Sequence, residues 1–146
     1  MTGASNPPHE QQDLGALMAQ VLPRLAALEE PILREAGLSM WEYAIVTEVA
    51  AGAAVSQREL SRRTRRDPTR LGKHLDELVS REIITRERSH DQRQRTVCIT
   101  PSGRALLTSV QRKIRAVEDE FLHAALSAGD AANFRNLLTR LAASCE

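Results

Sequence analysis

The sequence predicts a mainly α-helical protein with one small β-hairpin, folded as a single domain. Three observations support this fold class. Leu, Ala, Arg and Glu are frequent in a chain of 146 residues with only 3% aromatic residues, which favours helices packed through aliphatic side chains. Apolar residues recur at helical spacing towards both ends of the chain. Between residues 83 and 100 the pattern changes to that of two short strands.

The first ten residues are expected to form a disordered leader, because Pro, Gly, Ser and Asn are frequent there. A helix is predicted over residues 11–36. Pro23 and Pro31 are expected to bend or interrupt it, and Gly37 is a suitable C-terminal stop. Its apolar stripe consists of Leu14, Leu17, Met18, Val21, Leu22, Leu25 and Leu28.

Two capping patterns locate the next helices. Ser39 and Ser56 each precede a glutamate by three residues, and this spacing is typical of a capping box. Helices are therefore predicted over residues 40–51 and 57–63. Val55 lies where it can pack across the start of the second of these helices.

A third helix is predicted over residues 68–81, because Asp67 is a good N-cap and Pro68 is tolerated at the first helical position. Its buried stripe is expected to consist of Leu71, Leu75, Leu78 and Val79.

Two strands are predicted next, over residues 83–88 and 95–100, joined by a polar loop. Thr100 is expected to cap a long helix that begins at Pro101, and Ser127 a final helix. The apolar residues of these two helices are Leu106, Val110, Ile114, Val117, Phe121, Leu122, Leu126, Phe134, Leu137, Leu138 and Leu141.

Positive charge is concentrated in the middle of the chain. Residues 58–95 contain twelve Lys/Arg and seven acidic residues, whereas the whole chain has a net charge of +1. Such a concentration is expected of a surface that meets a polyanion. A charged run alone is more often a solvated face, so the underlying helix pattern decides between the two interpretations.

That pattern matches a helix-turn-helix, whose second helix enters the major groove of DNA while the first lies against the backbone. The helices over residues 57–63 and 68–81 have this arrangement, and the following hairpin would form a wing. The sequence therefore predicts a winged helix-turn-helix over residues 37–100. The long N- and C-terminal helices, residues 11–36 and 101–146, are predicted to form a dimerisation region, because their apolar stripes are too extensive for one small lobe to cover.

Double-stranded DNA is the expected partner. The first turns of the second helix are expected to read base edges, and the arginines around the turn to contact phosphates. In the wing loop, Arg93 suits the minor groove, and Asp91 would hold the loop in shape. The predicted DNA-binding residues are Arg62, Arg65, Arg66, Pro68, Thr69, Arg70, Lys73, His74, Asp91, Arg93 and Arg95.

Other functional classes find no support in the sequence. The four histidines and two cysteines lack metal-ligand spacing, and no phosphate-binding loop or nucleophile motif is present, so no catalytic residue, metal or cofactor is predicted. No apolar run approaches the length of a membrane span, and no membrane partner is expected. A cytoplasmic protein, associated with the nucleoid when bound to DNA, is the expectation. Cys98 and Cys145 are expected to be reduced bystanders.

The sequence resembles the MarR family (multiple-antibiotic-resistance regulators). The similar segments are residues 38–51, SQRELSRRT at 56–64, DPTRLGKHLDELVSREIITR at 67–86 and DQRQRTVCITPSGRALL at 91–107. The resemblance implies a winged-helix homodimer that represses transcription at a palindromic operator and is released by a small aromatic or phenolic effector. The alternative is a winged-helix module for protein–protein contact, without a ligand switch.

The resemblance also implies an effector pocket among the first helix, the second helix and the helix after the wing. Trp41 and Tyr43, the single Trp and Tyr of the chain, are candidate effector-binding residues there. The alternative, which the preference of large aromatic side chains for the core favours, is that Trp41 packs the start of its helix into the core. One departure from the family is Glu82, which stands where glycine is usual before the wing, so this turn is expected to be shaped differently. The reactive cysteine of hydroperoxide-sensing members is also absent from the first helix.

Overall fold

The computed structural model describes residues 12–88 and 95–145, and within them it shows a mainly α-helical fold with a small antiparallel sheet. The predicted fold class is confirmed. The predicted leader and the loop of the wing lie outside the described residues. In chain order the elements are α1 (Leu14–Ala36), α2 (Met40–Ala50), β1 (Val55–Ser56), α3 (Gln57–Thr64), α4 (Pro68–Ser80), β2 (Ile84–Arg88), β3 (Arg95–Ile99), α5 (Pro101–His123) and α6 (Ala128–Ala143).

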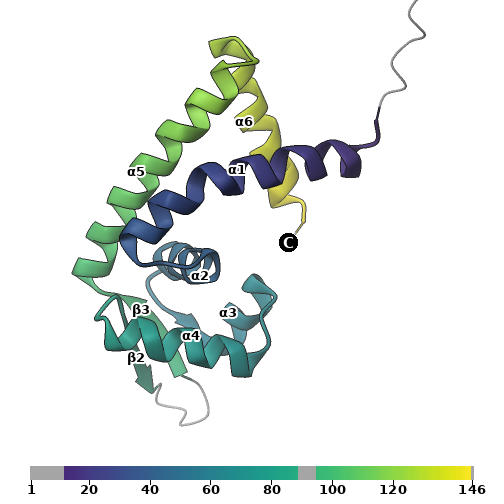
Figure 1. The fold of residues 1–146 in the computed structure, drawn as a ribbon. Coiled ribbons are helices and arrows are strands. Elements are labelled where there is room, and N and C mark those ends of the chain that lie inside the picture. The colour runs from purple at the N-terminus through teal and green to yellow at the C-terminus, as the bar shows by residue number, and fades with distance from the viewer. Residues whose placement is uncertain (1–11, 89–94, 146) are drawn as a thin grey trace, which may run out of the picture.

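The long helices form one part of the molecule and the winged lobe the other. Figure 1 shows α1 running along α5, with α6 folding back from the far end of α5. At the opposite end lie α2, α3, α4 and the sheet. The helix-turn-helix is therefore displayed at the end of the molecule away from the α5–α6 turn.

The sheet has three strands in the order β1-β3-β2, all antiparallel. Val97 in the central strand pairs with Val55 on one side and with Arg86 on the other. The predicted hairpin is confirmed, whereas β1 was not predicted. A strand of two residues is too short to show alternation, and it exists because β3 offers it a free edge.

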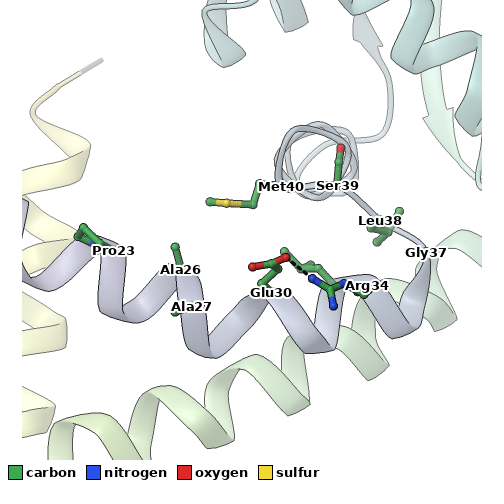
Figure 2. A pocket seen from close by; sticks show the side chains of 10 residues that line it. Pro23, Ala26, Ala27, Glu30, Arg34, Gly37, Leu38, Ser39 and Met40 are labelled. Carbon is green, nitrogen blue, oxygen red and sulfur yellow. Dashed lines mark hydrogen bonds and ion pairs between the residues drawn. The ribbon is translucent and has the colours of Figure 1, made fainter.

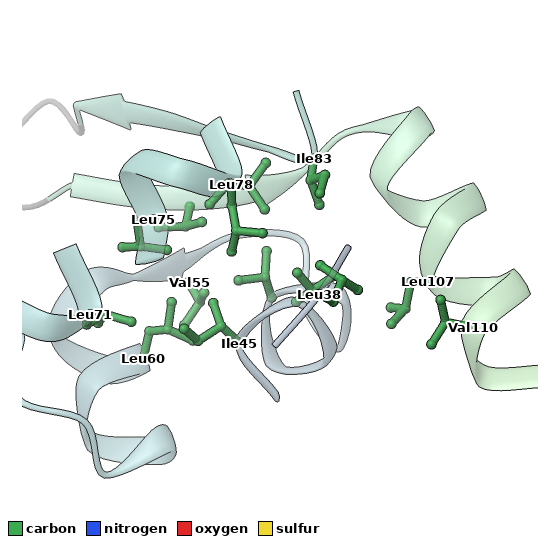
Figure 3. Close-up of a cluster of buried hydrophobic side chains, with 14 of the residues drawn as sticks. Leu38, Ile45, Val55, Leu60, Leu71, Leu75, Leu78, Ile83, Leu107 and Val110 are labelled. Atoms are coloured by element: carbon green, nitrogen blue, oxygen red, sulfur yellow. The ribbon is translucent and has the colours of Figure 1, made fainter. Parts of the chain in front are cut away.

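One aliphatic core joins α2, α3, α4, the sheet and α5 as far as Ile114, and it includes Leu33 near the end of α1; Figure 3 shows most of its side chains. On α4, Leu71, Leu75 and Leu78 are at most 1% exposed. Val79, predicted to belong to this stripe, is 37% exposed because it lies one residue beyond the row of leucines that meets the core. On α5, Leu107 is buried rather than the predicted Leu106, which is half-buried.

The caps of the helices explain where the elements begin. At Ser39 the predicted capping box is complete, with the Ser39 N–H donating to Glu42 at 3.0 Å and the Glu42 N–H to Ser39 at 3.1 Å. At Ser56 only half of it forms, because the Glu59 carboxylate accepts hydrogen bonds from two arginines instead. Pro23 and Pro31 lie inside a continuous α1, so the expected interruption does not occur. Each proline removes one backbone hydrogen bond, and 23 residues of helix provide enough others.

Candidate nucleic-acid interface

The first turns of α4 present the predicted base-reading residues to solvent. Thr69, Arg70 and Lys73 are exposed, on the face opposite the buried leucines. Asp67 caps the helix by accepting the Arg70 backbone N–H at 3.1 Å, and Pro68 occupies the first position, as predicted. The same Asp67 carboxylate lies 3.5 Å from the Arg70 Nε. Exposed ion pairs of this kind contribute little, so Arg70 can leave Asp67 for a base at small cost.

The end of α3 carries arginines that are already engaged with acidic residues. The Arg62 guanidinium donates to both oxygens of Glu59, at 2.5 and 3.1 Å, and Arg63 donates to Glu59 at 3.0 Å. These two arginines lower the pKa of Glu59 to about 2, so it remains ionised. The negative charge of Glu59 therefore offsets part of the positive charge of Arg62 and Arg63. Arg65 is exposed at the C-cap, in the left-handed region with φ 53°.

Arg66, predicted to contact a phosphate, points into the protein in this structure. Its guanidinium carbon lies 3.9 Å from the centre of the Trp41 ring, which is a cation–π arrangement. Its NH2 lies 3.3 Å from Nε2 of His74 on α4, and its carbonyl accepts a 2.6 Å hydrogen bond from Ser61. Arg66 thus joins α2, the turn and α4, and His74 faces this cluster rather than open solvent.

The wing is attached to α4 by Arg86, which was not among the predicted site residues. The Arg86 side chain in β2 is only 18% exposed, and it donates to Asp76 at 2.7 Å and to the carbonyl of Gly72 at 3.0 Å. Arg95 begins β3, is exposed and pairs across the ladder with Arg88. Asp91 and Arg93, the predicted wing-tip residues, lie outside the described residues.

A second unpredicted arginine holds the other end of α4. Arg81 donates from NH1 to the Gly37 carbonyl at 2.6 Å and from NH2 to the Ala36 carbonyl at 3.1 Å. Its sequence neighbours give no sign of this role, because one arginine in a basic segment looks like any other. Only the fold, which brings residues 36 and 81 together, distinguishes Arg81 and Arg86 from the exposed arginines.

A cavity of about 780 Å³ lies between α1 and the start of α2 (Figure 2). Its lining is mostly apolar, with an ion pair between Glu30 and Arg34 at one side. The lining residues are Pro23, Ala26, Ala27, Glu30, Leu33, Arg34, Gly37, Leu38, Ser39 and Met40. The two candidate effector residues are not among them. Trp41 stacks on Arg66, and Tyr43 is half-buried against the core.

Tyr43 of α2 instead lies near two carboxyl side chains, Glu29 of α1 and Glu118 of α5. Burial and the adjacent Glu118 of α5 raise the pKa of Glu29 of α1 from 4.5 to about 7. Burial, together with these two carboxylates, also raises the pKa of Tyr43. Arg135 of α6 lies 3.5 Å from Glu118, so it offsets part of this negative charge.

Within residues 12–88 and 95–145, no three His, Cys, Asp or Glu side chains are grouped so that they could hold a metal ion. No helix in these ranges is long and apolar enough to cross a membrane. Cys98 is half-buried in β3 and Cys145 is exposed, and both are free thiols.

Part of the chain is similar in sequence to a known family, and its fold is similar to solved structures. Residues 36–95 match the sequence model described as the MarR family. A search of curated proteins found no match. Among solved structures, wild-type Escherichia coli MarR without ligand is similar, with a TM-score of 0.80 and 22% identity over 90% of this chain and 98% of that one.

Two complexes are similar as well. An E. coli MarR variant in complex with operator DNA matches with a TM-score of 0.71 and 22% identity, over 88% of this chain and 92% of that one. A Mycobacterium tuberculosis MarR-family protein in complex with p-aminosalicylic acid matches with a TM-score of 0.73 and 24% identity, over 90% and 99%. The sequence match to the MarR family model is thus confined to residues 36–95, and the solved structures share the fold over nearly the whole chain.

Proposed function

We propose that this protein is a DNA-binding transcriptional regulator that inserts α4 into the major groove. The observation that supports this most directly is the two-sided nature of α4. One face is fixed in the core by leucines at most 1% exposed, and the other presents Thr69, Arg70 and Lys73 to solvent. A rigid helix with exposed donors near its N-terminus is what base recognition requires. The E. coli MarR variant of similar fold was solved with operator DNA.

The contacts are expected to divide by type. Thr69, Arg70 and Lys73 would contact bases, while Arg65, Arg95 and the N-terminus of α4 at Pro68 would contact phosphates. Arg62 can contact a phosphate if its guanidinium leaves the Glu59 carboxylate and binds the DNA backbone instead. Arg66 and His74 would act by holding the turn against α2. Asp91 and Arg93 keep their proposed role in the wing.

The proposed regulator acts as a homodimer. Rows of large apolar side chains on α1 and α6 are exposed, and a second copy of the chain is the simplest cover for them. They are Leu14, Leu17, Met18, Val21, Leu22, Leu28, Phe134, Leu137, Leu138 and Leu141, with exposures between 40% and 69%. Residues 11–36 and 101–146 would form the dimerisation region and residues 37–100 the DNA-binding lobe. Two-fold symmetry would then favour a palindromic operator.

A small aromatic or phenolic effector is proposed to release the repressor from DNA. The cavity between α1 and α2 has the apolar walls and the few polar groups of a small-molecule site, and Arg34 could meet a carboxylate. The M. tuberculosis relative was solved with p-aminosalicylic acid, a molecule of this class. The proposed protein is a cytoplasmic binding protein and not an enzyme.

The test is a salt titration of DNA binding. Affinity for random duplex DNA should fall steeply as salt rises, with log K decreasing by about 0.9 per phosphate contact for each tenfold increase in salt. A duplex recovered by selection from a random pool should bind more tightly than its scrambled version at every salt concentration. Weak binding that is equal for both duplexes would instead favour the alternative, a module for protein–protein contact.

A further inference from the structure

The last turn of α1 ends in a cap that is shared with the recognition helix. Gly37 adopts φ 72°, its N–H donates to the Arg34 carbonyl at 3.0 Å, and the Leu38 N–H donates to the Leu33 carbonyl at 2.9 Å. This is the Schellman arrangement that closes a helix C-terminus. The carbonyls of Ala36 and Gly37 then point away from the helix, and the Arg81 guanidinium donates to both, at 3.1 and 2.6 Å.

The backbone of Arg81 belongs to the end of α4. Its N–H donates to the Glu77 carbonyl at 3.2 Å, and the next two N–H groups donate to Val79 and Leu78, both at 3.0 Å. Arg81 therefore connects the C-terminal caps of two helices with one side chain. A guanidinium at the C-terminus of α1 is favoured because it meets both the helix dipole and two unsatisfied carbonyls.

The same turn forms a wall of the cavity described above. Leu33, Arg34, Gly37 and Leu38 line the cavity, and Gly37 also accepts the hydrogen bond from Arg81. Space on the Arg81 side of the turn is tight, since a methyl group added to Gly37 would lie 2.9 Å from Arg81 NH2. Gly37 is therefore in contact with the cavity on one side and with the Arg81 guanidinium on the other.

We propose that Arg81 is the positioning residue through which occupancy of this cavity changes the position of α4. The inference rests on the proposed function, because it concerns how the proposed regulator responds to an occupant with a small apolar body. Hydrogen bonds to Ala36 and Gly37 hold α4 in the DNA-competent position while the cavity is empty. An occupant moves the turn at Ala36 and Gly37, and α4 moves as well because Arg81 is hydrogen-bonded to both carbonyls.

The test fills the cavity with a side chain instead of a ligand. Ala26 points from α1 into the cavity (Figure 2), so Ala26→Phe imitates an occupant. It is combined with Arg81→Met, which keeps the length of the stem and removes the donors, and with Arg81→Lys, which keeps the charge. Ala105→Phe on α5, an exposed position that does not line the cavity, is the matched control.

Two measurements are made on every variant: affinity for a selected duplex, and the hydrogen exchange rates of the Glu82 and Ile83 amides. With Arg81 present, Ala26→Phe should weaken DNA binding by about tenfold and accelerate exchange at both amides, while in the Arg81→Met background the effect on affinity should be less than about twofold. Arg81→Lys should restore part of the coupling, which a purely structural role would not do. Ala105→Phe should change neither quantity.

Equal effects of Ala26→Phe in both backgrounds, or no effect with Arg81 present, would overturn the inference. Because hydrogen exchange requires no DNA, failure of the proposed function is recognised separately. In that case no variant, including the wild type, binds DNA, and the exchange rates still decide whether Arg81 couples the cavity to α4.

Discussion

The Arg66 guanidinium carbon lies 3.9 Å from the centre of the Trp41 ring, so a residue of the helix-turn-helix rests on the second helix of the chain. Trp41 is nevertheless 41% exposed. The pair joins the turn before the recognition helix to α2, whose first residue, Met40, lines the cavity. The sequence predicted a DNA contact for Arg66 and an effector contact for Trp41. In the structure these two side chains contact each other.

Replacing Trp41 by Leu should lower both stability and DNA affinity. The cation–π contact contributes about 0.5–1 kcal/mol at such an exposed site, and its loss should lower the free energy of unfolding by about that amount. Affinity should fall because Arg66 and His74 lose their support. Trp41→Phe is the matched control and should retain most of both quantities. Denaturant unfolding and a DNA titration on each variant provide the measurement, and a Leu variant as stable and as tight as wild type would refute the role of the pair.

Gly103→Ala should destabilise the protein strongly. A Cβ at this position would lie 2.1 Å from the Ile83 carbonyl oxygen, so α5 or the residue just before β2 must move. Overpacking of this kind typically costs about 1–3 kcal/mol or more. Gly72→Ala is the control, because nothing lies within 4 Å of the added methyl group and the position is inside α4. That change should stabilise the protein by up to about 1 kcal/mol in urea unfolding. Similar results for both glycines would contradict the close approach at Gly103.

Glu82→Gly should stabilise the protein. Glu82 has φ 58°, a left-handed conformation that costs a residue with a Cβ roughly 1 kcal/mol or more and costs glycine little. The turn before the wing thus keeps the backbone shape that glycine would give it, contrary to the expectation of a different shape. Glu82→Ala retains the strain and should change the unfolding midpoint much less. If alanine stabilised the protein as much as glycine does, the glutamate side chain rather than the backbone would be the cause.

Stability should depend on pH through Glu29. Its pKa is raised from 4.5 to about 7, chiefly by burial and then by Glu118, so the folded state binds a proton that the unfolded state has released. The free energy of unfolding should therefore fall as pH rises from about 4.5 to about 7. Glu29→Gln should remove this dependence and be more stable than wild type at pH 8, with a smaller advantage at pH 5. Glu35→Gln, an exposed position on the same helix, is the control. A Glu29→Gln variant whose advantage does not change with pH would contradict the shift.

Much of the fold could be predicted because the helix caps and the spacing of apolar residues indicate the same helices and strands. Ser39, Asp67 and Thr100 cap helices as the sequence indicated, and the period change after Glu82 located the hairpin. β1 could not be predicted, because its two residues form a strand only where β3 is present to pair with them. The continuity of α1 through Pro23 and Pro31 depends equally on its whole length and neighbours.

The sequence predicted which types of residue form the candidate site. It predicted less well which of the arginines face solvent and which bind other protein groups. The exposed face of α4, with Thr69, Arg70 and Lys73, lies where the helical period placed it. Arg81, Arg86 and Arg66 bind protein groups instead, and a run of arginines contains no local signal of which will fold inward. Their partners lie between 8 and 45 residues away in the sequence, so only the tertiary structure defines them.

The central claim is that the start of α4 reads DNA sequence. Its most direct test is the relative affinity of wild type, Arg70→Ala and Arg65→Ala for a panel of duplexes that differ from a selected site by one base pair each. Arg70→Ala should cost about 1–3 kcal/mol on the selected duplex and flatten the preference at one position in each half-site. Arg65→Ala should weaken all duplexes by a similar factor and keep the preferences. If Arg70→Ala left every preference intact and reduced only the overall affinity, Arg70 would not be a reader and the account of α4 would be contradicted.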